Sequence, residues 1–140
     1  MINQTGVGIL GTGVCIPEKV LTNKDMEQLV DTSDDWIRTR TGIRERRISE
    51  PGVPTSVLAE TAARNALTAS GISAEEVDLI ICATVTPDMI FPATACIVQD
   101  RIGAASAAAF DMEAGCTGFV YALATAAQFI ASGTYRYALV

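Results

Sequence analysis

The amino-acid sequence predicts an α/β protein in which a largely parallel β-sheet is covered by helices on both faces. Apolar runs typical of buried strands alternate along the chain with segments of helical periodicity. Residues 77–85 form one such run, with a single acidic residue near its start, as expected for a parallel strand buried on both faces. Residues 114–135 contain no charged side chain, which indicates a helix inside a protein. The length of 140 residues suits a single domain.

The first apolar segment, residues 7–13, predicts a strand that enters a glycine-rich turn. Its glycines partly match the dinucleotide-binding pattern G-x-G-x-x-G, but Ile16 occupies the third glycine position and no helix opens directly behind it. The other interpretation, which we favour, is a buried strand whose glycines allow close packing.

The remaining elements follow from periodicity and from helix-start and helix-stop residues. A short helix is expected over residues 25–30, with Thr22 or Asn23 as its N-cap. A second helix begins after Ser33 and ends at Gly42. Further helices are expected over residues 55–70, 93–102 and 114–132, and further strands over residues 77–85, 104–112 and 137–140.

Cys116 stands at the expected N-terminus of the uncharged helix. A thiol there lies at the positive end of the helix dipole, beside backbone N–H groups without intrahelical partners. Both effects favour the thiolate, and the same N–H groups can stabilise an oxyanion. The alternative is a buried cysteine that acts as a small hydrophobic residue.

Five of the ten basic residues lie between Arg38 and Arg47 in an otherwise acidic chain. Trp36 and Arg40 are four residues apart, so they share a helix face. An aromatic plane beside a guanidinium suits a nucleotide base stacked near phosphates. The alternative is a solvated face with ion pairs to Asp34, Asp35 and Glu45.

Composition narrows the classes of function. The net charge of −6 argues against nucleic acid as a partner, and the N-terminus lacks a signal-peptide pattern, so we expect a cytoplasmic protein. The uncharged run is long enough for a membrane span, but its Ala- and Gly-rich composition and lack of basic flanks disfavour one. The four cysteines lack C-x-x-C spacing and there is no histidine, so we expect reduced, separate thiols and no metal site.

Several motifs together resemble bacterial β-ketoacyl-acyl-carrier-protein synthase III, a member of the thiolase superfamily. Residues 31–47, DTSDDWIRTRTGIRERR, are similar to an early signature of that family. Residues 11–13 with Pro17, residues 91–93 (FPA), and residues 110–111 followed by AGCTGF at residues 114–119 agree with it as well. The resemblance implies one half of a thiolase-like fold, a mixed sheet between helix layers in an αβαβα arrangement. We expect residues 1–140 to form this single N-terminal domain, ending inside its last strand, with the C-terminal half absent.

The resemblance also implies a function and site residues. Members of this family condense an acyl-CoA, usually acetyl-CoA, with malonyl-acyl carrier protein to start fatty acid synthesis, without a cofactor, and form homodimers. Cys116 matches the nucleophile that carries the acyl group. Trp36 matches the residue that stacks on the adenine of CoA, Arg40 a neighbouring nucleotide contact, and Thr32 a third residue of that site. Phe91 matches a residue that reaches the acyl pocket of the partner subunit.

The departures from the family are equally informative. The family's other two catalytic residues, a histidine and an asparagine, belong to the second half, and this chain has no histidine. We therefore expect the chain alone to be inactive in condensation and to cover its exposed surface by self-association, unless it is part of a longer polypeptide. Gly115 replaces an alanine that is commoner beside the nucleophile. The competing interpretations are a CoA-binding module without chemistry and a purely structural unit.

Overall fold

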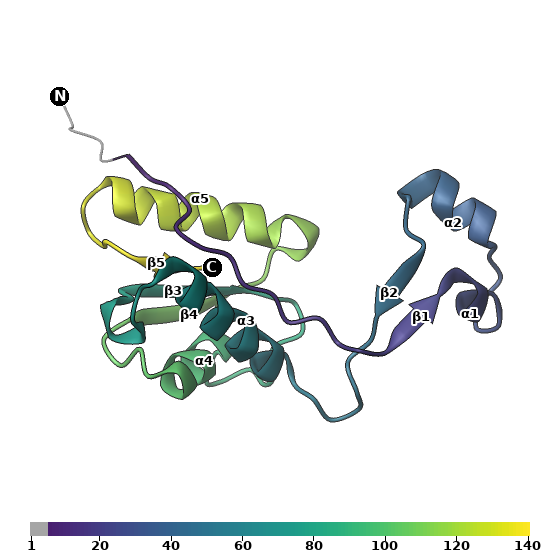
Figure 1. Cartoon of the computed structure of the whole chain (residues 1–140), viewed down its shortest axis with the longest axis horizontal. Helices are drawn as coiled ribbons and strands as arrows, with labels where there is room; N and C mark the ends of the chain where they lie inside the picture. The colour runs from purple at the N-terminus through teal and green to yellow at the C-terminus, as the bar shows by residue number, and fades with distance from the viewer. Residues whose placement is uncertain (1–5) are drawn as a thin grey trace. The chain divides into compact units, whose positions relative to one another are not determined.

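The computed structural model describes residues 6–140, which form two compact units. The small unit is residues 16–53, and the large unit comprises residues 6–15 and 54–140. Figure 1 shows the order of helices and strands along the chain.

The large unit is built on a three-stranded parallel sheet. Its strands are β3 (Leu79–Ala83), β4 (Ala108–Met112) and β5 (Ala138–Leu139), in the order β4-β3-β5. Central β3 pairs with β4 along its whole length and with β5 over two positions, so that Leu79 lies between Ala108 and Ala138. The expected strands over residues 77–85, 104–112 and 137–140 are thus confirmed, each in a shorter form.

Helices cover both faces of this sheet, as predicted (Figure 1). Ile80 of β3 packs in one apolar cluster with Ala63 of α3 (Thr55–Ser70) and Val98 of α4 (Thr94–Ile102). Leu79 and Ile81 point the other way and pack against α5 (Gly118–Ala131). Alternate residues of one strand therefore contribute to two cores, which explains the continuous apolar run.

The predicted helix stops are also confirmed. α3 and α4 end at Gly71 and Gly103, whose φ angles of 71° and 86° belong to the left-handed region that glycine adopts without strain. A short 3₁₀ turn, η1 (Ala74–Glu76), leads from α3 into β3.

The prediction of a buried strand over residues 7–13 is wrong. This segment is extended but has no ladder partner among the described residues, and Ile9 and Leu10 are exposed. β4 and β5 occupy the two edges of β3, so the segment does not pair with the central strand. The segment lies on α3 instead: a Cβ on Gly13 would collide with the α3 backbone, and Asn65 Nδ2 donates to the Val14 carbonyl at 2.9 Å. The expectation of glycines that permit close packing is therefore correct.

The small unit contains a two-stranded antiparallel sheet, which was not predicted from the sequence. β1 (Val20–Thr22) pairs with β2 (Glu45–Arg47), and α1 (Asn23–Glu27) and α2 (Asp34–Thr41) lie between them in sequence. The first helix ends three residues earlier than expected. Its N-cap is Thr22, which exchanges hydrogen bonds with Asp25 in a capping box. The helix expected after Ser33 is confirmed, together with its end at Gly42.

Within residues 6–140 no helix combines the length and the apolar character required to cross a bilayer.

Candidate functional site

Cys116 lies in a tight 3₁₀ turn, η2 (Gly115–Thr117), that joins β4 to α5. A Cβ placed on Gly118 would lie 3.4 Å from the Ala83 Cβ and 3.8 Å from the Met112 carbonyl oxygen. Because Ala83 and Met112 are the last residues of β3 and β4, the turn sits at the carboxyl end of the parallel sheet. This is the end at which α/β proteins bind their ligands.

The turn presents Cys116 to solvent. Gly115 adopts a φ of 54°, and this left-handed residue redirects the chain as it leaves the strand. The expected helix start at Ala114 is therefore wrong by one turn, because the α-helix begins at Gly118 and Cys116 precedes it. The alternative of a buried packing cysteine is excluded by the exposure of Cys116.

The helix behind Cys116 is less enclosed than its lack of charge led us to expect. Its buried residues are the small ones, Gly118, Ala122 and Ala126, which pack on β3. The larger residues Phe119 and Tyr121 are exposed. These small side chains let the helix approach the sheet closely.

The other three cysteines differ from Cys116. All four are unpaired, and Cys15, Cys82 and Cys96 are half-buried. Burial, together with the nearby carboxylates of Asp111 and Asp88, raises the pKa of Cys82 to about 11. Cys82 therefore remains a neutral thiol at physiological pH. Among the described residues, no three Cys, Asp or Glu side chains come together as a metal site.

Trp36 and Arg40 form a contact on the exposed face of α2. The Arg40 guanidinium carbon lies 4.9 Å from the centroid of the Trp36 ring, and the ring itself is 54% exposed. The backbone N–H of Trp36 donates to the Ser33 hydroxyl at 3.1 Å, which caps the helix. The expectation that these two side chains share a face is confirmed, and their arrangement is a cation–π pair open to solvent.

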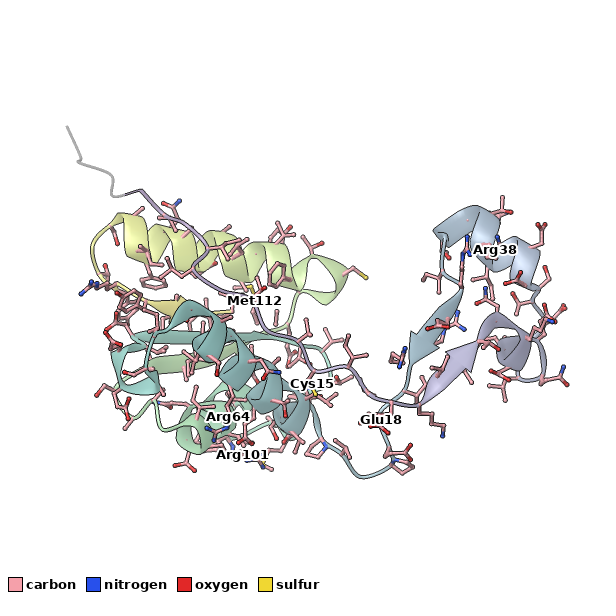
Figure 2. The ribbon with its side chains drawn as sticks, viewed as in Figure 1. Cys15, Glu18, Arg38, Arg64, Arg101 and Met112 are labelled. Atoms are coloured by element: carbon pink, nitrogen blue, oxygen red, sulfur yellow. The ribbon has the colours of Figure 1, made fainter. Side chains whose placement is uncertain are left out.

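Two of the remaining arginines of the cluster form ion pairs. Arg38 pairs with Asp34 at 3.4 Å, and Arg47 pairs with Glu45 at 3.6 Å (Figure 2 labels Arg38). Both pairs were anticipated in the interpretation of a solvated, ion-paired face. That interpretation holds for these residues, whereas Arg40 has its contact with the Trp36 ring.

Asn23 organises the small unit, a role that the sequence analysis missed. It is 1% exposed, and its Nδ2 donates to Asp34 Oδ1 and to the Ile43 carbonyl, both at 2.8 Å. Its Oδ1 accepts from Arg46 Nη2 at 2.9 Å. These bonds join the first turn of α2 to the two-stranded sheet, so Asn23 sets the position of the helix that carries Trp36. A polar residue just after an N-cap gives no sign of such a role.

Phe91 lies in the loop between β3 and α4, where it is 86% exposed. Carboxylates hold the loop at both ends. Asp88 Oδ1 accepts from the Ser56 N–H at 2.8 Å, and Asp111 accepts from the N–H groups of Thr94 and Ala95, each at 2.7 Å. These bonds satisfy the starts of α3 and α4, whose own N-cap residues, a proline and an alanine, offer no side-chain acceptor.

A shared glutamate joins the two helices that these carboxylates cap. Glu60 of α3 pairs with Arg64 at 3.0 Å and with Arg101 of α4 at 3.7 Å, and Figure 2 shows the two arginines close together. Arg101 also donates to the buried Ser56 hydroxyl at 3.0 Å. The base of the loop that carries Phe91 is thus held by polar contacts.

The five expected site residues fall into two groups. Trp36, Arg40 and half-buried Thr32 belong to the small unit, where Thr32 directly precedes the cap of α2. Cys116 and Phe91 belong to the large unit, and both segments follow the carboxyl ends of strands.

The comparisons with known proteins all point to the same family. The family model described as 3-oxoacyl-[acyl-carrier-protein] synthase III matches residues 110–140. The β-ketoacyl-[acyl-carrier-protein] synthase III of Desulfitobacterium hafniense strain Y51 is 60% identical over 98% of the chain. That of Caldanaerobacter subterraneus is 57% identical over 100% of the chain. The chain spans 41% and 42% of these relatives.

Solved structures agree with this relationship. The 3-oxoacyl-[acyl-carrier-protein] synthase III of Aquifex aeolicus matches 93% of the chain with a TM-score of 0.87 and 52% identity, over 42% of its own length. The priming β-ketosynthase of the R1128 polyketide pathway matches 97% of the chain with a TM-score of 0.89 and 35% identity, over 41% of its length. The thiolase-like fold expected from the resemblance is confirmed. The chain therefore belongs to the β-ketoacyl-acyl-carrier-protein synthase III family and corresponds to the N-terminal part of such a synthase.

Proposed function

We propose that this chain is the acyl-accepting part of an enzyme that condenses an acyl-CoA with malonyl-acyl carrier protein at the start of fatty acid synthesis. The observation that supports this most directly is the exposure of Cys116 on a turn at the carboxyl end of the sheet, one turn before an α-helix. The names of the relatives point to the same reaction class.

In the proposed step, the Cys116 sulfur attacks the thioester carbonyl of the acyl-CoA. A new carbon–sulfur bond forms at Cys116, the bond to the CoA sulfur breaks, and CoA leaves as its thiolate, which takes up a proton. Backbone N–H groups at the start of α5 are suited to stabilise the oxyanion of the tetrahedral intermediate. Covalent transfer of this kind divides one difficult condensation into two easier steps.

Trp36 and Arg40 are proposed to hold the nucleotide end of CoA, with Thr32 beside them. The exposed Trp36 ring offers a flat surface for the adenine, and the Arg40 guanidinium, which forms no ion pair among the described residues, supplies positive charge for a phosphate. The arginines already paired with acidic side chains are less suited to this role.

Condensation needs further groups, since the histidine and asparagine of the family have no counterpart here and the chain contains no histidine. We therefore expect acylation of Cys116 without condensation from this chain alone. In the whole synthase we propose a cytoplasmic homodimer, in which the exposed Phe91 enters the acyl pocket of the partner subunit.

The test is acyl transfer from radiolabelled acetyl-CoA. We expect covalent label on Cys116, located by peptide mass spectrometry, and no label in Cys116→Ser. The matched variant Cys82→Ser should keep the label, because Cys82 is a half-buried thiol of raised pKa. Quenching of Trp36 by CoA without covalent label would favour the CoA-binding module. A chain that neither binds CoA nor accepts acetyl would have a structural role.

A further inference from the structure

Asp111 belongs to β4, the strand that leads directly to the Cys116 turn. Its neighbour Met112 packs in the cluster against α5. Because successive side chains of a strand alternate between the two faces of a sheet, Asp111 points to the other face, toward α3 and α4. Asp111 also pairs in register with Cys82, whose thiol pKa is raised by burial and by the carboxylates of Asp111 and Asp88. Both carboxylates therefore lie near the same position of β3.

The Asp111 carboxylate holds the first turn of α4. Its Oδ2 accepts from the N–H of Thr94 and its Oδ1 from the N–H of Ala95, both at 2.7 Å. Thr94 and Ala95 are each 0% exposed, and the N-cap residue Ala93 has no side-chain acceptor. Hydrogen bonds from the N-terminal N–H groups of a helix to a carboxylate are strong because charge assists them. A residue of the sheet thus supplies the cap that α4 itself lacks.

The first turn of α4 is also the end of the loop that carries Phe91. Phe91 is 86% exposed and Ile90 is 100% exposed, so the position of the loop depends on how its two ends are held. At its start, Asp88 Oδ1 accepts from the N–H of Ser56 at 2.8 Å, which ties the loop to α3. At its end, Asp111 ties it to β4.

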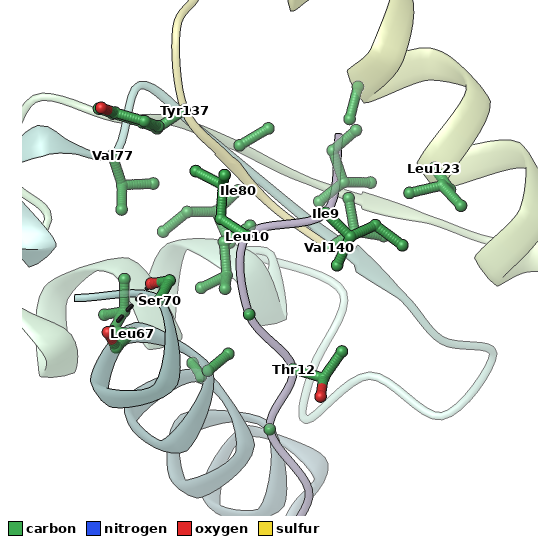
Figure 3. Close-up of a pocket in the computed structure, with 18 of the residues that line it drawn as sticks. Ile9, Leu10, Thr12, Leu67, Ser70, Val77, Ile80, Leu123, Tyr137 and Val140 are labelled. Atoms are coloured by element: carbon green, nitrogen blue, oxygen red, sulfur yellow. Dashed lines mark hydrogen bonds between the residues drawn. The ribbon is translucent and has the colours of Figure 1, made fainter. Parts of the chain in front are cut away.

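Other contacts of the large unit do not fix this loop to β4. A cavity of about 750 Å³ is lined by residues 7–13 and by parts of α3, α5 and β5, and none of the described residues 84–93 lines it (Figure 3). Farther along α4, Gln99 Nε2 donates to the Ala107 carbonyl at 2.6 Å. That bond holds the body of the helix on the sheet, so loss of the Asp111 carboxylate would release the first turn of α4 and the loop alone.

Resting on the function proposed above, we propose that Asp111 is a positioning residue, which fixes the loop of Phe91 to the strand that ends at the Cys116 turn. One carboxylate then sets the separation between the acyl-accepting sulfur and this loop. In the proposed homodimer Phe91 serves the acyl pocket of the partner subunit. Asp111 therefore links the acyl-accepting turn of one subunit to the acyl pocket of the other, and it acts through the loop rather than on the acyl group.

The experiment measures this separation directly. Spin labels are attached to Cys116 and to Ile90→Cys, since both positions are exposed, and electron paramagnetic resonance gives the distribution of distances between them. The same chain with Cys116→Ser gives the background from the half-buried cysteines. Asp111→Ala should broaden the distribution about twofold or more, because the loop is then free at one end. The control Asp100→Ala removes an exposed carboxylate from the same helix and should leave the distribution unchanged.

A second variant separates positioning from simple helix capping. Ala93 has N-cap geometry, with φ of −58° and ψ of 147°, so a serine hydroxyl there can accept from the first turn of α4. Ala93→Ser combined with Asp111→Ala should restore the thermal unfolding midpoint, followed by circular dichroism, but not the narrow distance distribution. Because the double variant has its own cap, its distribution decides the matter if Asp111→Ala alone does not fold.

The outcomes distinguish this proposal from the proposed function. A distribution that stays narrow in Asp111→Ala, or that Ala93→Ser makes narrow again, would overturn the positioning role. Acetyl transfer to Cys116 is measured in parallel on the unlabelled chain. The expected change in distances without acetyl transfer would support the role of Asp111 and count against the proposed function. Acetyl transfer with unchanged distances would do the reverse.

Discussion

The buried amide of Asn23 and the carboxylate of Asp34 are joined by a hydrogen bond of 2.8 Å across eleven residues of sequence. The same amide nitrogen donates to the Ile43 carbonyl, so one side chain connects the start of α2 with the segment that follows it. The face proposed to hold CoA therefore depends on a residue that does not itself lie on it.

Replacing Asn23 by alanine should destabilise the small unit by about 2–3 kcal/mol, because a buried side chain loses its three hydrogen bonds. Urea unfolding followed by Trp36 fluorescence measures this directly, since the chain has one tryptophan. The control is Gln28→Ala, an exposed position where we expect a change below about 0.5 kcal/mol. Equal midpoints for the two variants would contradict the role given to Asn23.

The small unit should lose stability in acid. The hydrogen bond from Asn23 lowers the pKa of Asp34 below its ordinary value of 3.8, and the Arg38 side chain lowers it further. Because the folded pKa lies below the unfolded one, this stabilisation is present above the ordinary value and is lost as the pH falls through the folded value. A Trp36 fluorescence titration from about pH 6 to about pH 2 should show the loss, and Asp34→Asn should flatten it.

Two glycines close to Cys116 should respond in opposite directions to alanine. Gly115→Ala places a side chain at a φ of 54°, which should cost about 1–2 kcal/mol although no atom lies within 4 Å of the new Cβ. Gly118→Ala adds a Cβ at ordinary contact distance to a helical residue and should stabilise by about 0.4–1 kcal/mol. Thermal unfolding of the large unit, followed by circular dichroism, gives both signs. Stabilisation by Gly115→Ala would mean that the turn does not hold this conformation.

The cysteines should differ in their reaction with iodoacetamide. Near pH 8 a pKa of about 11 leaves Cys82 as thiolate in roughly one molecule in a thousand, so Cys82 should react last, and exposed Cys116 first. Peptide mapping over time gives the order, and the urea-unfolded chain, in which the order should disappear, is the control. Asp111→Asn should lower the pKa of Cys82 toward its ordinary value, because it removes one of the raising charges.

Local signals predicted the helices and the strands of the large unit well. Gly42, Gly71 and Gly103 each end a helix where the sequence placed the stop, and the alternation of elements gave the parallel sheet with both faces covered. The contact between Trp36 and Arg40 followed from a spacing of four residues. In each of these cases the determining interaction lies within a few residues of sequence.

Long-range strand pairing and distant hydrogen-bond partners could not be predicted in this way. Residues 7–13 have the pattern of a strand, yet β5, more than a hundred residues later, takes the edge of β3. The carboxylates of Asp88 and Asp111 cap helices whose own cap residues give no indication of it. The two-stranded sheet pairs β1 with β2 although two helices separate them in sequence and no turn motif joins them.

The two units should respond differently to cooling. In the small unit the buried residues are Asn23 and Ile37, so its unfolding exposes little apolar surface and carries a small heat-capacity increment. The large unit buries two clusters of aliphatic side chains, and its stability should fall more steeply at low temperature. Cold storage would thus reduce the stability of the unit that carries Cys116 more than that of the unit that carries Trp36.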